Sequence, residues 1–154
     1  MADGTPWEAT LEDMHMMADD LASGGWETLT VVAGDTGAVT RDAGTDSDNR
    51  LGLVHVIQGD DADRLDPLVE DGSFSTSEAY VAVAGDTEYA VTVLKDPGEC
   101  RAVLIASAVA YDHARDCFDE AAREGTIATY LQRLDGTPVA TFEHDDPTLF
   151  EPPA

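Results

Sequence analysis

His113 and Cys117 stand four residues apart in a stretch with helical periodicity, and side chains of these types can bind metal or act in catalysis. Side chains four positions apart lie on the same side of a helix, so both can face one point. With Asp112 or Asp116 they could contribute to a metal site, and alternatively His113 could serve as the base for a Cys117 nucleophile. The competing interpretation is structural: Cys117 packs as a small hydrophobic residue and His113 is solvated. The pattern favours the structural interpretation, and the pair is kept as a candidate metal site.

Four aspartates crowd the short segment that follows a predicted strand ending at Ile57, namely Asp60, Asp61, Asp63 and Asp66. Carboxylates in such a position suit a divalent cation, so Asp60, Asp61 and Asp63 form a second candidate metal site. Acids at the start of a helix also interact favourably with the helix dipole. This second interpretation is favoured, and no cofactor is predicted.

Two groups of apolar side chains are candidates for binding a partner. Met14 and Met17 lie in a methionine-rich N-terminal helix, and methionine adapts to irregular surfaces. Leu149 and Phe150 stand among acids near the C-terminus, where a short apolar peptide could dock into a groove of another protein. Packing in the core is the commoner reason for such residues and is the competing interpretation for both groups.

The chain lacks the local motifs of familiar enzyme classes: GxSxG, a P-loop, GxGxxG after a strand, CxxC and HExxH. His55 alternates with valines in a predicted strand and is expected on a half-exposed face. The sequence therefore favours a non-enzymatic interaction, regulatory or assembly module, with self-association into a homodimer as one form. The alternatives are a small-ligand or divalent-metal protein, such as a hydrolase, that uses the Asp60–Asp66 segment or His113 and Cys117, and an acidic mimic of nucleic acid.

The charge of the chain is strongly negative: 32 Asp and Glu stand against 8 Lys and Arg, which gives −24, and Lys95 is the single lysine. The acids run from Asp3 to Glu151 instead of forming one block. At about 1 M salt the Debye length is only about 3 Å, so repulsion among such charges is screened. This distribution predicts adaptation to concentrated salt. Direct nucleic-acid binding is not expected, because clustered Lys and Arg for phosphate contacts are missing.

The segments TPWEATLEDM and FEHDDPTLFEP, in a chain this poor in lysine, resemble the small acidic uncharacterised proteins of haloarchaea. The resemblance covers the whole chain, is mostly compositional and implies a cytoplasm rich in potassium chloride, but it transfers no catalytic motif. No apolar run approaches the ~18 residues of a membrane span, and no signal-peptide pattern is visible. We therefore expect a cytoplasmic protein without membrane contact, whose two cysteines are reduced.

Periodicity and turn signals predict the elements that must position these residues. Thr5, Pro6 and Glu8 form a capping box with proline at the first helical position, and this helix extends to Gly24. A short helix is expected at 60–70 and a longer one that ends at Gly125. Strands are expected at 26–33, 37–41, 51–57, 78–84, 89–94, 101–107, 126–134 and 138–144, with hairpin turns at 34–35 and 85–86.

These elements predict an α+β fold in one domain, residues 1–146, followed by a C-terminal tail, residues 147–154. Short turns require antiparallel neighbours, so we expect a mainly antiparallel meander sheet packed on one face by two main helices. A partly exposed sheet face could close a homodimer. The pentapeptide VAGDT at residues 32–36 recurs at 83–87, an offset of 51 (83 − 32). Two interpretations are open: an internal αβββ repeat, or coincidence in a chain whose commonest residues include Ala, Val, Gly, Asp and Thr.

Overall fold

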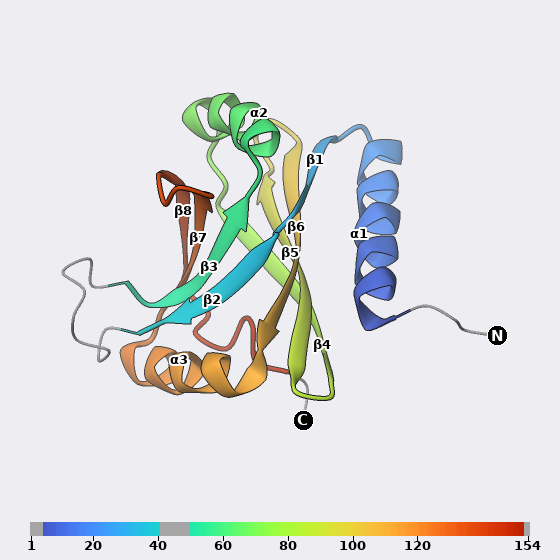
Figure 1. Ribbon diagram of the computed structural model, residues 1–154. Coiled ribbons are helices and arrows are strands. Elements are labelled where there is room, and N and C mark those ends of the chain that lie inside the picture. Colours follow the sequence, from blue (N-terminus) through green and yellow to red (C-terminus); the bar gives the residue numbers. More distant parts are fainter. Residues whose placement is uncertain (1–4, 41–49, 153–154) are drawn as a thin grey trace.

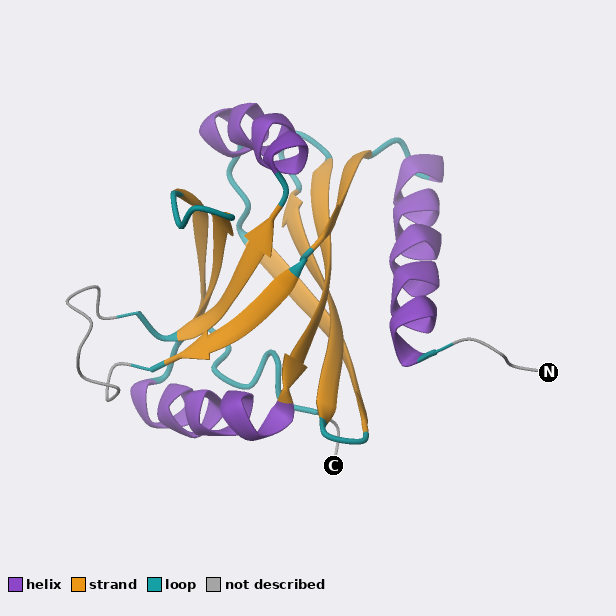
Figure 2. Ribbon diagram, in the orientation of Figure 1, coloured by secondary structure: helices purple, strands orange, loops and turns teal. Residues whose placement is uncertain are grey.

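The computed structural model describes residues 5–40 and 50–152 and shows an α+β protein with three helices and eight strands in this part of the chain (Figures 1 and 2). The α+β class predicted from the sequence is confirmed. In chain order the elements are α1 (Pro6–Ser23), β1 (Glu27–Val32), β2 (Asp35–Val39), β3 (Gly52–Ile57), α2 (Gly59–Asp71), β4 (Thr76–Ala84), β5 (Thr87–Asp96), β6 (Arg101–Ala110), α3 (Tyr111–Glu124), β7 (Ile127–Arg133) and β8 (Pro138–His144).

The strands form two four-stranded sheets, in which most neighbours are antiparallel, as predicted. Sheet A has the order β1-β6-β5-β4, and sheet B has the order β2-β3-β7-β8. Each sheet also contains one parallel pair, β1 with β6 and β3 with β7. These pairs join strands that lie far apart in the sequence. The single meander expected from short turns is therefore replaced by two mixed sheets.

Strand β1 runs almost directly into β2 and carries the chain from sheet A to sheet B. The Ala33 amide donates to the carbonyl of Ala106 on β6 at 2.9 Å, and the next amide, of Gly34, donates to the carbonyl of Val56 on β3 at 2.9 Å. Strands β1 and β2 pair with different neighbours and not with each other. The hairpin predicted at residues 34–35 is therefore wrong.

The order of elements is α1-β1-β2-β3, then α2-β4-β5-β6, then α3-β7-β8, which is the order expected of an αβββ repeat. The pairing differs between the first two units, because β4, β5 and β6 form a meander whereas β1 lies in sheet A and β2 and β3 lie in sheet B. The second VAGDT segment does form a tight hairpin, in which Gly85 has a φ of 62°. The internal repeat stays a prediction.

The interior between the two sheets contains two apolar clusters, one at α2 and one at α3, and these helices lie at opposite ends of the strands (Figure 1). The first cluster joins Leu65 of α2 to Ile105 of sheet A and Leu131 of sheet B. The second joins Phe118 of α3 to Leu53 of sheet B. Burial of such side chains, at roughly 25 cal/mol per Å² of apolar surface, is the main stabilising contribution to the fold.

Helix α1 packs on the outer face of sheet A, where Met14 and Ala18 are buried against Leu104 (Figure 2). The predicted capping box is confirmed: the Glu8 amide donates to the Thr5 hydroxyl at 3.1 Å, and the Thr5 amide donates to the Glu8 carboxylate at 3.1 Å. The three helices thus lie on different sides of the strands, whereas the sequence placed two main helices on one face. None of the helices in the described ranges is long and apolar enough to cross a membrane.

The described part of the predicted C-terminal tail, residues 147–152, continues from β8 as a turn that returns to the core. Phe150 is completely buried in the cluster at α3, and Leu149 packs against the same cluster. Residues 153 and 154 lie outside the described part of the chain. The division into a single domain and a separate tail stays a prediction.

Candidate functional site

A layer of polar side chains crosses the interior between the two apolar clusters. On β3, His55 lies between Ile57 of the cluster at α2 and Leu53 of the cluster at α3, and β6 and β7 show the same sequence of apolar, polar and apolar positions. Every second residue of a strand faces the same side, so these polar residues point inward with their apolar neighbours. We call the following buried residues the interior polar layer: Thr36, His55, Thr92, Ser107, Thr129 and His144.

Two threonine–histidine hydrogen bonds hold the histidines of this layer. Thr36 Oγ1 lies 2.9 Å from Nδ1 of His55, and Thr129 Oγ1 lies 2.8 Å from Nε2 of His144. The second ring nitrogen of each histidine is buried and has no hydrogen-bond partner among the described residues. Thr92 Oγ1 is likewise buried and has no hydrogen-bond partner among the described residues. Buried polar atoms normally have a partner, so the three unpartnered atoms of this layer are an exception among the buried polar groups of the described residues.

Both histidines of the layer are held in the neutral form. Burial lowers the pKa of His55 from 6.5 to about 4, and it lowers the pKa of His144 to about 4 as well, although the charge of Asp145 opposes this second shift. Removal of water disfavours the charged imidazolium. A neutral imidazole has one nitrogen that donates and one that accepts, so the unpartnered nitrogen of each histidine is a donor or an acceptor according to the tautomer.

A buried carboxyl group lies beside the layer on β5. Glu88 is not exposed at all, and neither of its oxygens has a hydrogen-bond partner among the described residues. It shares the inward face of β5 with Thr92 and stands opposite Val109 of β6. Burial raises the pKa of Glu88 from 4.5 to about 8, so the carboxyl group is protonated and uncharged at neutral pH.

A surface pocket of about 160 Å³ opens where β4 and β8, the terminal strands of the two sheets, approach each other. On the α2 side of this gap, the rings of Phe74 and Phe142 meet edge to face with 5.8 Å between centroids. Deeper in, His144 contacts Phe150 in the same manner, also at 5.8 Å. The residues that line the pocket include Ser75, Ser77, Glu143, His144, Asp145 and Asp146. The pocket therefore reaches the interior polar layer at His144.

A family model covers almost the whole chain, since it matches residues 2–152. The chain belongs to DUF7529, a family of unknown function. No curated protein and no solved structure matches this DUF7529 chain at a significant level. The family therefore adds no ligand or activity, and the geometry of the described residues carries the functional argument.

In this DUF7529 chain the two residues of the predicted His–Cys pair have different environments. Cys117 is completely buried, and its thiol donates to the carbonyl of Gly52 at 3.5 Å. Burial, followed by the charge of Glu120, raises the pKa of Cys117 to about 12, so a thiolate nucleophile is not available at neutral pH. No disulfide joins Cys117 to Cys100, which is exposed. These facts agree with the structural interpretation of Cys117.

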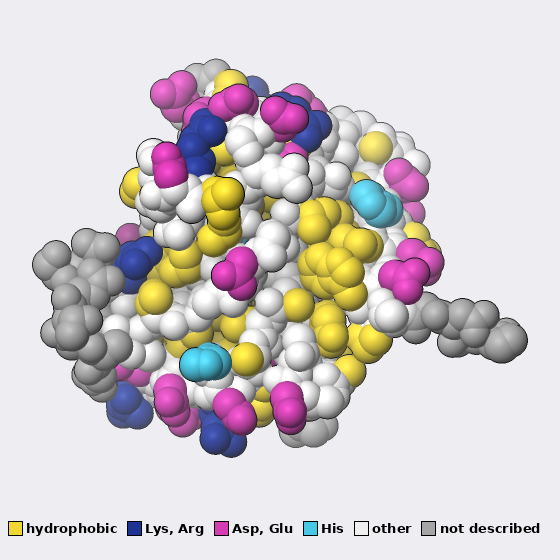
Figure 3. Space-filling view, viewed as in Figure 1, with side chains coloured by type: hydrophobic (Ala, Val, Ile, Leu, Met, Phe, Trp, Pro, Cys, Tyr) yellow, Lys and Arg dark blue, Asp and Glu magenta, His cyan; other side chains and the backbone are white. Residues whose placement is uncertain are grey.

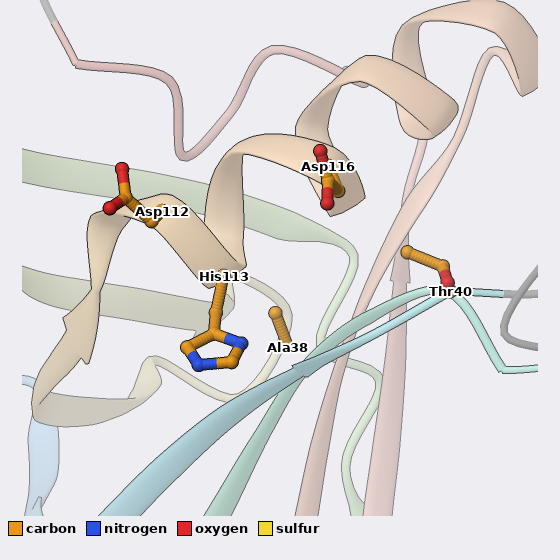
Figure 4. A pocket seen from close by; sticks show the side chains of 5 residues that line it. All are labelled: Ala38, Thr40, Asp112, His113 and Asp116. Atoms are coloured by element: carbon orange, nitrogen blue, oxygen red, sulfur yellow. The ribbon is translucent and has the colours of Figure 1, made fainter.

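His113 is exposed and lines a second pocket, of about 370 Å³, between α3 and β2. Figure 4 shows that its ring points towards Ala38, whereas the Asp112 carboxylate projects away from that ring. Within residues 5–40 and 50–152, no three His, Cys, Asp or Glu side chains gather in a way that could hold a metal ion. The pair His113 and Cys117 thus has no third ligand in this part of the chain.

The predicted aspartate site lies on the first turns of α2. Asp61 accepts a hydrogen bond from Arg64 at 2.7 Å, and Asp63 accepts one from Arg133 of β7 at 2.7 Å. Asp60 is exposed in the first turn of the helix. The carboxylates of Asp61 and Asp63 therefore contact arginines, and Asp60 stands where an acid interacts favourably with the helix dipole.

The predicted partner-binding side chains lie mainly inside the fold. Met14 and Phe150 are completely buried, while Met17 and Leu149 are partly buried against the core. A partner could contact Met14 or Phe150 only if the described structure opened.

The interior polar layer was not predicted as a site from the sequence. His55 was expected on a half-exposed face, and this expectation is wrong, because its side chain is completely buried. One signal was present: His55 occupies one position of an otherwise apolar inward-facing series on β3, and Glu88 shares such a series on β5 with Thr92, Ala90 and Leu94. Alternation alone cannot tell which face of a strand is covered, since that depends on the opposite sheet.

Proposed function

We propose that the chain is a non-enzymatic assembly module that associates with a second copy of itself through the free edge of sheet A. The observation that carries this proposal is the exposed second half of β4, residues 80–84, which has the uncharged sequence YVAVA. Tyr80 is 50% exposed and Val83 is 42% exposed. An edge strand presents unpaired backbone groups along one side, and these are a template for another strand.

Glu78, the acid that precedes this uncharged strip, has its negative charge compensated by a contact within the chain. Glu78 accepts hydrogen bonds from the Tyr80 hydroxyl at 2.7 Å and from the Lys95 ammonium at 2.9 Å. These two contacts, Tyr80 first, lower the pKa of Glu78 and keep it ionised. Carboxylates that face each other across two strands are destabilising. In a chain of net charge −24, residues 80–84 are thus a strip in which two copies can meet without carboxylates facing each other inside the strip itself.

A second copy suits this edge better than an unrelated partner because two identical strands can pair antiparallel about a two-fold axis. Each β4 then donates to and accepts from the other. Sheet A of one copy continues into sheet A of its partner, and the pair forms one sheet of eight strands (4 + 4). Tyr80 and Val83, which project from opposite faces of β4, each gain cross-strand neighbours in this arrangement.

Light scattering in several molar KCl tests the proposal, and the expected mass is twice 16.4 kDa. Ala82 is exposed on β4 and Ala122 is exposed on α3, so Ala82→Lys and Ala122→Lys add the same charge at two exposed alanines. We expect Ala82→Lys to weaken dimerisation tenfold or more, about 1.4 kcal/mol, and Ala122→Lys to leave it unchanged. A strictly monomeric wild type, or equal behaviour of the two variants, would contradict the proposal.

The setting that we propose for this module is a halophilic cytoplasm. Figure 3 supports it, because Asp and Glu side chains are scattered over the visible face and lie on all three helices instead of gathering in one patch. Concentrated salt screens the repulsion among acids that are spread over the surface. A binding face for one basic partner would instead require the acids to be concentrated in one place.

A further inference from the structure

We propose that a pocket on the outer face of sheet B binds a small aromatic carboxylate, with the Arg50 guanidinium at the carboxylate and the Tyr130 ring beside the aromatic part. The pocket has a volume of about 470 Å³, and the residues that line it include Arg50, Tyr130, Gln132, Pro138 and Thr141. This volume lies within the roughly 300–1,000 Å³ of pockets that hold small organic ligands. The proposal concerns reversible binding alone, and it does not depend on the pairing of β4 in sheet A.

The alternation of β7 turns side chains of this pocket away from the interior. Thr129 and Leu131 are buried between the two sheets. Tyr130 and Gln132 therefore project from the opposite face of β7, and both are partly exposed. Thr141 of β8 is the register partner of Tyr130 and is exposed on the same face. Helix α1 packs on sheet A, and α2 and α3 lie at the ends of the strands, so none of the three described helices covers this face (Figure 1).

Arg50 and Tyr130 form one surface that is already assembled. The Cζ atom of Arg50 lies 5.6 Å from the centroid of the Tyr130 ring. The Leu51 amide donates to the Tyr130 hydroxyl at 2.9 Å, which holds the ring against the chain segment that carries Arg50. Arg50, like Tyr130, is partly exposed. A ligand therefore meets a guanidinium and an aromatic ring side by side, and this preorganisation lowers the entropic cost of binding.

The charge of the pocket is opposite to that of the chain. No Asp or Glu is among the described residues that line it, although the chain contains 32 of them. The pockets at His113 and at His144, by contrast, are lined by acids. A guanidinium binds a carboxylate through parallel N–H bonds. It has several N–H donors, so a carboxylate can share Arg50 with the other interactions that this residue makes.

The neutral side chains of the pocket define the rest of the ligand. The Gln132 amide and the Thr141 hydroxyl can donate to carboxylate oxygens without adding charge. A single guanidinium balances a single negative charge, so a carboxylate suits this pocket better than a doubly charged phosphate. The Tyr130 ring and Pro138 supply apolar surface, on which an aromatic ring packs favourably.

Calorimetric titration of the full chain with benzoate at constant KCl tests the proposal. We expect saturable binding that shifts the ring NMR signals of Tyr130. Benzyl alcohol keeps the ring without the charge, and acetate keeps the charge without the ring, so each should bind at least tenfold more weakly than benzoate. No saturable binding of benzoate, or an affinity for benzyl alcohol or for acetate equal to that for benzoate, would overturn the proposal.

Variants locate the binding. Arg50→Gln should weaken benzoate binding at least tenfold, whereas Arg115→Gln, which removes the same charge at an exposed position of α3, should have no effect. Wild-type affinity in Arg50→Gln would refute the proposed role of the guanidinium.

A second pair of variants keeps the test decisive if Arg50→Gln does not fold. Gln132→Ala and Thr141→Val change side chains that line the pocket, and each should weaken benzoate binding at least threefold. Gln58→Ala, at the exposed N-cap of α2, is the control for Gln132→Ala and should bind benzoate as the wild type does. Unchanged affinity in both Gln132→Ala and Thr141→Val would place benzoate elsewhere and overturn the proposal. Dimerisation is measured separately, so either result can fail without the other.

Discussion

Glu88 gives the stability of this protein a pH dependence that a surface glutamate would not give. The unfolded chain releases the Glu88 proton near pH 4.5, whereas burial raises the pKa in the folded chain to about 8. The stability that the protonated carboxyl contributes is complete below pH 4.5 and is lost as the pH rises through this window. Glu88→Gln keeps the shape of the side chain and removes its titration. We expect the free energy of unfolding of this variant to exceed that of the wild type at pH 8 by a few kcal/mol, since one pKa unit corresponds to about 1.4 kcal/mol. Denaturant unfolding at constant KCl across this range measures the difference.

The two histidines of the interior polar layer give the stability a pH dependence opposite to that of Glu88. Their pKa falls from 6.5 to about 4 on folding, so the stability they contribute is present above pH 6.5 and is lost as the pH falls towards 4. Wild type and Glu88→Gln share these histidines, and subtraction of the two profiles isolates Glu88. A difference that stays constant between pH 5 and pH 8 would show that Glu88 does not titrate in this window.

Gly52 is a position where β3 leaves no room for a side chain beside β7. A Cβ atom at Gly52 would lie 1.9 Å from the carbonyl oxygen of Ala128, its register partner on β7, and the φ of Gly52 is 155°. Backbone cannot yield as a flexible side chain does, so we expect Gly52→Ala to destabilise the fold by about 2 kcal/mol or more in denaturant unfolding. Gly37→Ala on β2 is the matched control, because a Cβ atom there meets no atom within 4 Å. Equal unfolding midpoints for the two variants would contradict this account of the β3–β7 contact.

The elements themselves were largely predictable from local signals, and their pairing was not. The capping box at Thr5 and the turn at Gly85 depend on neighbouring residues, and both are confirmed. The pentapeptide VAGDT shows the limit: at 83–87 it forms a hairpin, and at 32–36 it carries the chain between sheets. Only β6 and β3, which lie far away in the sequence, decide between these outcomes, and a local pattern contains no information about them.

The candidate site was not predictable for a related reason. Sequence spacing singled out His113 with Cys117 and the aspartates of α2, which are neighbours in sequence. Within the described residues, these side chains do not come together as a site that could hold a metal ion. The interior polar layer takes one residue from each of six strands, including His55 and His144, and its chemistry depends on burial. Sequence spacing cannot show such a layer before the two sheets are placed face to face.

Across the whole molecule, the acidic side chains far outnumber the Lys and Arg side chains that could pair with them. Lys95, the single lysine, pairs with Glu78 at 2.9 Å and lies over the ring of Trp26 at 5.9 Å. Arg133 pairs with Asp63 at 2.7 Å and lies 3.7 Å from Asp66. Even if every Lys and Arg were paired, 24 negative charges would remain (32 − 8). Such exposed pairs contribute little stability individually, so the salt in the solution must reduce the repulsion.

This excess predicts that dilution of salt destabilises the fold. The Debye length grows from about 3 Å at 1 M to about 10 Å at 0.1 M, so charges on neighbouring elements begin to repel one another as KCl is removed. We expect the melting temperature to fall by about 10 °C or more between these salt concentrations, which corresponds to a few kcal/mol for a chain of this size. Sucrose, which stabilises compact states without screening charge, is the control and should not restore the loss in full at low KCl. A melting temperature that is the same in low and high KCl would contradict adaptation to concentrated salt, because 24 unscreened charges would then have no effect on folding.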